Sequence, residues 1–527
     1  MELELFFFII LAFFFLSYIL WSRFSRVFKI NCVNPTPSIE RYDRVNYVPA
    51  KFISIFGGHF GSSFGIGPLV GSFFLVKFGL VPFLMWVVLG SAVLGAFYDF
   101  AVLLFLVRNE QGSVFKIAEN YLGKFSRYIL FPLLLLNIFF LSLIILKFFT
   151  GVVDGNGFLI SALIFVQVFV LLLSFISRFI YISQGIMFLL SALGGAISVF
   201  IAYKFPLYLK FDELTWGFIL ILYVFILAFL PVSLNFQPKG YLNSALFILI
   251  FVLLFSGIFR SGEKSFDSAP LFVKENLFFL PLLFIGVSCG ALSGFHSIFS
   301  FVSAKQISSE CHISKVGLGS SILEGLFLST FALFILKLIP ESLDKKFISE
   351  ISKNFSFIFP FFDKLFLFVV LNFLLSSFES MVRGLKFISE DFFSYDSQPS
   401  RFDFRVHIFL LLFLLISLAF SLWWQDLEDA WYFAGLSGLT VSLGFSIMLF
   451  QWFLKEFRNV FLLLFSFSVI LFLLFISSWG TIVLGAKYFY GYGISFLVIP
   501  SFVAIFLIYS VSKLFLGLVY ERFRKGD

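Results

Sequence analysis

Charged residues are scarce in this chain of 527 residues: Asp, Glu, Lys and Arg make up 13% of it, while hydrophobic residues make up 60%. Because soluble domains carry about 25% charged residues, the composition excludes a water-soluble globular protein. Apolar runs of roughly 20 residues recur along the chain, which is the length a helix needs to cross the hydrocarbon of a bilayer. The runs do not alternate apolar with polar residues, so a membrane β-barrel is also excluded. We therefore expect an all-α polytopic integral membrane protein.

Cysteine is rare as well, with three residues in the whole chain, Cys32, Cys289 and Cys311, and no CxxC spacing. Cys32 and Cys311 fall in loops that we expect in the cytoplasm, and Cys289 falls within an apolar run. Disulfides are rare in that compartment, so the sequence predicts no disulfide framework.

Catalytic motifs are missing from the sequence. It contains no GxSxG elbow, HExxH pair, Walker loop or CxxCH haem site, and its four histidines are dispersed. We therefore expect a protein that is not an enzyme, with no cofactor and no metal site.

Basic residues gather in alternate loops, notably those at residues 23–49, 108–127 and 383–405. Hydropathy gives about fifteen spans, among them 50–77, 241–259, 279–302 and 494–518, and the positive-inside rule then predicts an outside N-terminus and a cytoplasmic C-terminus. The net charge of +7 therefore reflects orientation in the membrane rather than binding to nucleic acid. We expect one transmembrane transporter domain over residues 1–527. Within it, residues 1–49 hold the first span and a cytoplasmic loop, residues 50–453 the transport core, and residues 454–527 accessory C-terminal spans and a cytoplasmic tail.

One predicted span, 50–77, is interrupted by glycine and proline at membrane depth. Its residues with a candidate role in substrate binding are Gly57, Gly58, His59, Gly65, Gly67, Pro68 and Gly71. Transporters bind substrates at such broken helices, where a half-helix N-terminus offers free N–H groups to an anion. The alternative is close helix packing through small residues such as Gly57 and Gly61.

A second segment, residues 285–301, repeats the pattern and adds Ser293, Gly294 and His296 to the candidate binding residues. Each interrupted segment is followed by a helix with one acid, Asp99 in the first case and Glu324 in the second. Interrupted segments in both halves of a chain indicate the central site of a secondary transporter. Chance remains the alternative to a true internal repeat.

Ionisable side chains at membrane depth need a reason to be there, because burying a charge in hydrocarbon is costly. The candidates for ion coupling are His59, Asp99, His296, Glu324, Glu379 and Arg383. The competing interpretation is a structural hydrogen bond or ion pair. Glu379 and Arg383, four residues apart on one helix face, could simply pair with each other.

These segments resemble the carbon starvation protein A (CstA) family. The similarity rests on YVPAKFISIFGGHFGSSFGIGPLVG and FYDF within residues 47–100, on LPVSLNFQPKGYL at 230–242, on CGALSGFHS at 289–297, on Glu324, and on the Glu379–Arg383 segment. The chain departs from the family pattern at Gly58, which replaces a second histidine. It departs again at 435–439, where a motif resembling GIANQ lacks its Asn and Gln.

The resemblance implies an importer of small carboxylates, pyruvate especially, or of peptides, driven by an ion gradient. It also implies the inverted-repeat, broken-helix fold of the amino acid–polyamine–organocation transporters. We therefore expect a multi-pass protein of the bacterial inner membrane that couples uptake to protons, with sodium as the alternative ion. Its expected partners are the substrate, the ion and the lipid bilayer, and the sequence leaves its oligomeric state open. A peptide permease is the main rival, and a channel or an integral membrane enzyme fits the dispersed polar residues less well.

Overall fold

The computed structural model describes residues 3–109, 113–260, 280–335, 346–353, 361–394, 403–457 and 459–492, and parts of 505–513. Across these residues the chain is helical, and the only β pairing in them is one isolated bridge between Ala50 and Ile307. The prediction of an all-α protein is confirmed.

The first elements of the chain precede a bundle of helices, here called the core, that runs from α3 (Phe52–Phe64) to α19 (Leu427–Glu456). They comprise α1 (Leu3–Phe24), the 3₁₀ turn η1 (Ser25–Phe28) and the short helix α2 (Pro37–Glu40). The first half of the core follows, with α3 (Phe52–Phe64), α4 (Gly67–Phe78), α5 (Leu80–Leu89), the π-helical turn η2 (Gly90–Gly95), α6 (Ala96–Asn109), α7 (Val114–Leu122), α8 (Ser126–Val153), α9 (Gly157–Ser177), α10 (Gln184–Lys204), α11 (Glu213–Phe229) and α12 (Phe236–Arg260).

The second half of the core has the same kinds of elements. It contains α13 (Leu280–Gly286), the 3₁₀ turn η5 (Ser288–Gly290), α14 (Phe295–Ala304), α15 (Glu310–Ile335), α16 (Phe347–Lys353), α17 (Phe362–Phe393), α18 (Phe404–Trp423) and α19 (Leu427–Glu456). The long helix α20 (Val460–Tyr492) comes after the core.

Eleven helices in the described part of the chain are long and apolar enough to cross a membrane. Two predicted spans, 50–77 and 279–302, are instead helix pairs, α3–α4 and α13–α14, as the glycine pattern predicted. The predicted span 494–518 lies largely outside the described residues. The count of about fifteen spans and the orientation in the membrane stay predictions.

Local sequence explains the first break. Gly65 ends α3 with a φ of +44°, a backbone conformation that favours glycine. Pro68, in the first turn of α4, has no N–H, and its ring would collide with the carbonyl of Phe64 if the helix continued. The second break is longer and runs through η5 to Gly294, the residue that precedes α14.

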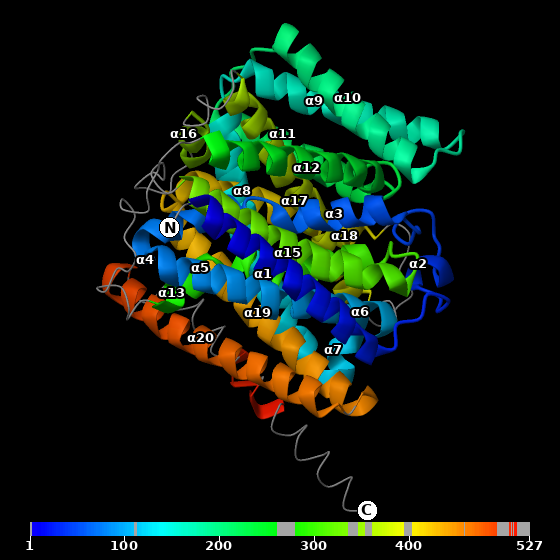
Figure 1. Ribbon diagram of the computed structural model, residues 1–527, viewed down its shortest axis with the longest axis vertical. Helices are drawn as coiled ribbons and strands as arrows, with labels where there is room; N and C mark the ends of the chain where they lie inside the picture. The colour runs from blue at the N-terminus through cyan, green and yellow to red at the C-terminus, as the bar shows by residue number, and fades with distance from the viewer. Residues whose placement is uncertain are drawn as a thin grey trace, which may run out of the picture.

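The packing of the helices follows an inverted repeat. One set comprises α3–α4, α5–α6, α8, α11 and α12, and the other comprises α13–α14, α15, α17, α18 and α19. Helices in corresponding positions of the two sets pack against each other: α6 against α15, and α11 against α18. The neighbouring contacts correspond as well, because α8 packs on α18 and its counterpart α17 packs on α11. The α9–α10 hairpin is an insertion in the first set. It lies on one flank of the bundle and α20 on the opposite flank (Figure 1). The insertion makes the first set longer in sequence than the second.

Candidate functional site: a buried carboxylate–histidine cluster beside two broken helices

Three of the predicted coupling residues meet in the middle of the bundle. His296 Nδ1 lies 2.9 Å from both carboxylate oxygens of Asp99, and its Nε2 lies 3.3 Å from Glu324 Oε2. All three side chains are buried, with exposed fractions of 2% or less. Two acids that follow the two breaks in the chain therefore converge on one imidazole from the second broken helix.

The bonding around this imidazole is unequal. Asp99 has two short contacts to the ring, whereas neither oxygen of Glu324 has a hydrogen bond of good geometry within the described residues. The 3.3 Å approach of Glu324 to His296 is therefore an electrostatic contact. Glu324 is the less satisfied of the two acids.

Small residues let the backbone come close enough to build the cluster. The π-helical turn η2 precedes α6, and a side chain at Gly95 would overlap the carbonyl of Ala291 in the second break. A side chain at Gly317 of α15 would press on the backbone at Asp99 and Phe100. Single π-helical turns occur frequently at functional sites, because they redirect the side chains that follow them.

His59 lies near this cluster without joining it. Its Nδ1 is 2.9 Å from the hydroxyl of Ser303 on α14, and its ring is fully buried. Its Nε2 has no hydrogen-bond partner in the described part of the chain. A buried imidazole nitrogen without a hydrogen-bond partner is unusual in folded proteins and calls for a functional explanation.

Gly57 and Gly58 serve helix packing in this conformation. Both lie inside the continuous helix α3. A side chain at Gly57 would overlap the carbonyl oxygen of Gly240, and one at Gly58 would come within 2.6 Å of the ring of Phe236. The packing interpretation raised from the sequence therefore accounts for these two residues, and it does so through contact with α12.

The break itself is formed by Gly65, Gly67 and Pro68. A Cβ atom on Gly65 would lie 2.8 Å from the hydroxyl of Ser377 on α17, so a side chain is excluded by contact as well as by φ. A Cβ atom on Gly71, one turn further along α4, would meet its nearest neighbours at 3.6 Å, which is ordinary van der Waals contact. Gly65, Gly67 and Pro68 therefore shape the break between α3 and α4, and Gly71 is less constrained.

The second break is held from one side by α19. The Gly294 N–H donates to the carbonyl of Gly438 at 3.0 Å, and the Phe295 N–H donates to the Ser293 hydroxyl at 3.2 Å. A side chain at Gly435 would overlap the carbonyl of Ile285. The first amides of α14 are thus already bonded within the protein, and the glycines in the 435–439 motif permit this close contact.

Glu379 and Arg383 do not bond to each other. Lys239 Nζ lies 2.5 Å from Glu379 Oε1, and both side chains are at most 7% exposed. Arg383 instead donates to the carbonyl of Leu227, in the last turn of α11, at 2.5 Å. A cation at that position favourably meets the carbonyl end of a helix. These residues form a second polar cluster, separate from the His296 cluster.

The other members of this second cluster are not among the residues that the sequence predicted. Glu379 also accepts from the Tyr223 hydroxyl at 2.6 Å and from Asn235 Nδ2 at 2.7 Å, and Gln167 Nε2 donates to Asn235 Oδ1 at 2.7 Å. Lys239 falls outside the predicted spans, one of which begins at residue 241, whereas α12 begins at Phe236. The run NFQPKG between two apolar segments was the available signal.

The prediction of no disulfide is wrong. Cys32 and Cys311 are bonded, with their Cα atoms 5.0 Å apart and 279 residues between them in sequence. The loop after α1 lies against the start of α15, where Ala50 N–H donates to the carbonyl of Gln306 and Ser38 to that of Ile307. Cysteine spacing along the chain carries no sign of this long-range contact.

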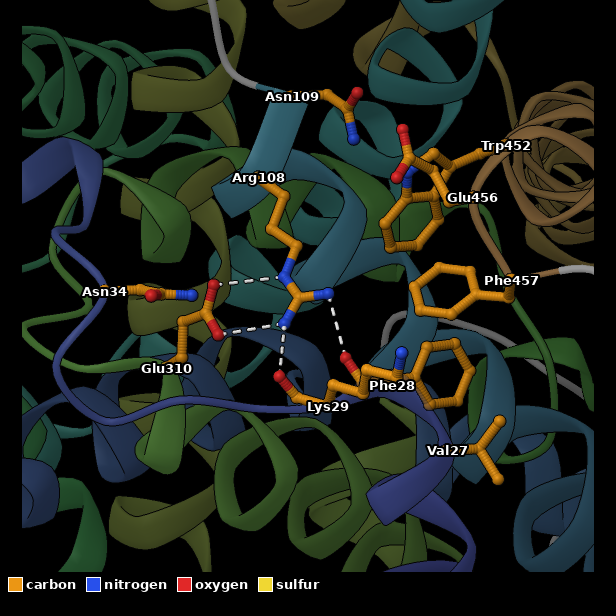
Figure 2. A pocket seen from close by; sticks show the side chains of 10 residues that line it. All are labelled: Val27, Phe28, Lys29, Asn34, Arg108, Asn109, Glu310, Trp452, Glu456 and Phe457. Carbon is orange, nitrogen blue, oxygen red and sulfur yellow. Dashed lines mark hydrogen bonds and ion pairs between the residues drawn. The ribbon is translucent and has the colours of Figure 1, made fainter.

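A cavity of about 500 Å³ lies at the same end of the bundle (Figure 2). Arg108 lines it and bonds both oxygens of Glu310 at 3.0 Å, and also the carbonyls of Phe28 and Lys29. Trp452 is among the aromatic residues in its wall. The arginine thus joins α6, α15 and the segment after α1.

Comparison with known proteins identifies the family. The family model described as "Carbon starvation protein CstA" matches residues 4–354. The chain belongs to the CstA family. Eleven helices in the described residues are long and apolar enough to cross a membrane, so this CstA-family chain is a multi-pass membrane protein.

Curated CstA-family relatives are similar over more than half of this chain. The pyruvate/proton symporter BtsT of Escherichia coli is 29% identical over 336 residues, which are 60% of this chain and 46% of that protein. The peptide transporter CstA of Escherichia coli is 31% identical, covering 59% and 46%, and that of Campylobacter jejuni is 26% identical, covering 57% and 45%. The matched region therefore spans about half the length of these relatives.

Solved structures place this CstA-family member in a known fold. A variant of the manganese transporter of Eremococcus coleocola aligns with 91% of this chain and 98% of its own length, with a TM-score of 0.52 and 13% identity. The same transporter in complex with an aromatic bis-isothiourea compound gives a TM-score of 0.50, covering 91% and 99% at 13% identity. The chain has the fold of the amino acid–polyamine–organocation transporters, as the resemblance implied.

Proposed function

We propose that this chain imports a small organic carboxylate together with a proton, with pyruvate as the first substrate to test. The observation that carries the proposal is the buried cluster of Asp99, His296 and Glu324 beside the two broken helices. The 29% identity to a pyruvate/proton symporter supports the choice of substrate and ion. The residue ranges 1–49, 50–453 and 454–527 remain our proposed division into entry segment, transport core and accessory spans.

The charge of the cluster supplies the coupling. With both acids ionised and the imidazole protonated, the cluster carries one net negative charge, and one further proton makes it neutral. An uncompensated charge in a water-free core costs several kcal/mol, whereas water tolerates it. The cluster therefore binds the extra proton when the site is closed and releases it when water enters from the other side. Glu324, with no good hydrogen bond in the described structure, is the acid we assign to this proton.

The substrate carboxylate is assigned to the first break. Gly65 and Pro68 flank the start of α4, where the positive end of the helix dipole favours an anion. Pro68 has no N–H and the Leu69 N–H donates to the Ile66 carbonyl, so the dipole rather than a set of free amides carries this assignment. The corresponding amides of α14 are bonded to Gly438 and Ser293. The Gly294 N–H is released if α14 moves away from α19, whereas the Phe295 N–H is bonded to Ser293 within the same segment. We therefore assign the second break a role in opening.

His59 is assigned a place between the two sites. It is on α3, directly before the first break, and it bonds to α14 through Ser303. Its unbonded Nε2 is buried, so it can pass a proton or bond a substrate oxygen. Replacing His59 with alanine should abolish uptake while leaving membrane insertion intact.

A peptide permease is the second candidate, because several relatives at 26–31% identity are named peptide transporters. A peptide brings an ammonium group, which would need an acid as its partner. Asp99 or Glu324 would then bind substrate rather than the coupling proton. The two candidates therefore assign the same acids to different ligands.

Uptake by purified protein in liposomes tests the proposal. Labelled pyruvate and short alanine peptides are offered with an inward proton gradient, with an inward sodium gradient, and with neither. We expect proton-dependent accumulation of pyruvate. Accumulation of peptides alone would favour the second candidate, and accumulation driven only by sodium would refute proton coupling.

Glu324→Gln separates coupling from binding. The variant should lose accumulation driven by the proton gradient but keep exchange of labelled for unlabelled substrate, because exchange moves no net proton. The matched control is Glu40→Gln, the same change at an exposed residue of α2, which should behave like the native protein. Full gradient-driven accumulation by Glu324→Gln would remove this acid from the mechanism.

A further inference from the structure

We propose that Cys32 and Cys311 are a redox modification site that controls whether the cytoplasmic end of the transport core can open. The inference rests on the proposed function, because it concerns the regulation of the same transport cycle. The two cysteines are bonded, and the side chain of Cys32 is exposed while that of Cys311 is partly exposed. A reagent in the aqueous phase can therefore reach the bond.

The bond lies beside the contacts that tie α6 to α15. The N–H of Asn31, next to Cys32, donates to Glu310 Oε2 at 3.1 Å, and the Ser309 hydroxyl donates to the Cys32 carbonyl at 3.2 Å. Glu310 in turn precedes Cys311 and bonds to Arg108. The cysteines thus join the two segments that carry the acceptors of this arginine.

Arg108 is held by four hydrogen bonds from two directions. Its guanidinium donates to both oxygens of Glu310 on one side and to the carbonyls of Phe28 and Lys29 on the other (Figure 2). The Glu310 side chain is 4% exposed and that of Arg108 is 22% exposed. Charge-assisted hydrogen bonds of this kind are about twice as strong as neutral ones. As long as the loop after α1 and the start of α15 stay together, they enclose the arginine.

The same two helices carry the acids of the coupling cluster. Asp99 and Arg108 are both on α6, and Glu324 and Glu310 are both on α15. In this proposal, opening the bundle between these helices from this end requires Arg108 to separate from Glu310. The cysteine bond opposes that separation, because it holds the two sets of acceptors in one place.

Forming the bond needs a disulfide oxidant, and breaking it needs a dithiol reductant. When the bond forms, the two thiols lose two electrons and two protons to a disulfide oxidant of the glutathione class. A dithiol reductant reverses this: its thiolate attacks one cysteine sulfur, forms a mixed disulfide and leaves as a cyclic disulfide, which returns both thiols. The basic residues of the surrounding loop, including Arg23, Arg26, Lys29 and Arg41, predict that this end faces the cytoplasm. In that compartment such bonds are transient and report the redox state.

The test compares oxidised and reduced protein in the same liposomes. Protein is equilibrated with oxidised glutathione or with dithiothreitol, and thiol labelling by a maleimide-linked polymer reports the bond. Hydrogen exchange is then measured for residues 25–35, 100–109 and 306–315, together with the initial rate of uptake. We expect slower exchange in all three segments and about tenfold slower uptake in the oxidised state. Cys32→Ser and Cys311→Ser should each remove both differences.

The outcomes separate this inference from the proposed transport activity. If labelling shows that no bond forms under oxidant, or if the bond forms without changing hydrogen exchange in these segments, the inference is wrong. If the bond slows exchange but leaves an active protein transporting at the same rate, the inference is also wrong. If no substrate is transported in either state, the proposed function fails, and the claim that the bond regulates transport fails with it. The exchange data would still establish that the bond closes this end.

Discussion

The buried pair of Lys239 and Glu379 gives the sharpest quantitative prediction. In Glu379→Gln the ammonium of Lys239, 2.5 Å from the carboxylate and 5% exposed, loses its counterion. The hydroxyl of Tyr223 and the amide of Asn235, which both donate to this carboxylate, then meet a neutral group. Removing one partner of a buried ion pair costs about 3–5 kcal/mol. We therefore expect this variant to be about 4 kcal/mol less stable.

Thermal melting of the protein in detergent, followed by fluorescence-detected size exclusion, measures the effect. Unfolding entropies of about 2.1 cal/mol/K per residue correspond to roughly 1 °C per kcal/mol for a chain of this length, so the midpoint should fall by about 4 °C. Adding Lys239→Met removes the stranded charge and should restore most of the loss, because apolar replacement of a whole buried pair is close to neutral.

Glu390→Gln is the matched control, since it makes the same change on the same helix, α17. Glu390 is 33% exposed and lies 3.6 Å from Lys386, which is 6% exposed but also donates to Asn46 Oδ1 at 3.4 Å. Because this contact is longer and partly open to solvent, its loss should cost clearly less than the loss of Glu379. The reasoning is refuted if Glu379→Gln costs no more than this control. It is equally refuted if Lys239→Met adds to the damage of Glu379→Gln instead of relieving it.

The glycines of the first broken helix give two further predictions. Gly65→Ala should destabilise the protein by about 1–3 kcal/mol and reduce uptake, because Gly65 has a positive φ and its Cβ would lie 2.8 Å from Ser377. Adding Ser377→Gly should restore only the part of the lost stability and uptake that comes from this contact, which thermal melting and uptake assays will measure. Gly57→Ala should prevent folding, since its methyl group would overlap the Gly240 carbonyl, whereas Gly71→Ala, with contacts of 3.6 Å, should fold and melt as the native protein does. Equal yields of folded protein from the last two variants would contradict the packing argument.

Much of the site was predictable because charged side chains are costly in the hydrocarbon of a bilayer, so the few that occur at membrane depth are candidates for function. Asp99, His296 and Glu324 stood out as charges at membrane depth, and a physical reason was expected for each of them. Their meeting was not predictable, since His296 and Asp99 are 197 residues apart. Only the inverted packing of the two halves brings the helices that follow the breaks onto one histidine.

Glycine content alone did not distinguish glycines that allow close helix packing from glycines that end a helix. Gly57 and Gly65 belong to the same run, yet one packs a continuous helix against α12 and the other ends it. The position of Pro68 decides where the break falls, because its ring acts on the carbonyl four residues earlier. The Lys239 pair and the cysteine bond were missed for a different reason: their partners lie 140 and 279 residues apart in the sequence.

The position of the carboxylate–histidine cluster along α6 makes it sensitive to membrane voltage. Asp99 precedes Arg108 on this helix by nine residues, which is about 13.5 Å of helix at 1.5 Å per residue. With the predicted orientation, a proton arriving from outside crosses roughly half of the hydrocarbon, whose thickness is about 30 Å. An elementary charge gains about 2.3 kcal/mol per 100 mV over the full thickness, so filling the cluster gains roughly half of that. Under the proposed proton coupling, the membrane potential would therefore act on the loading of the site itself, and the driving force for uptake would persist when the pH is equal on the two sides.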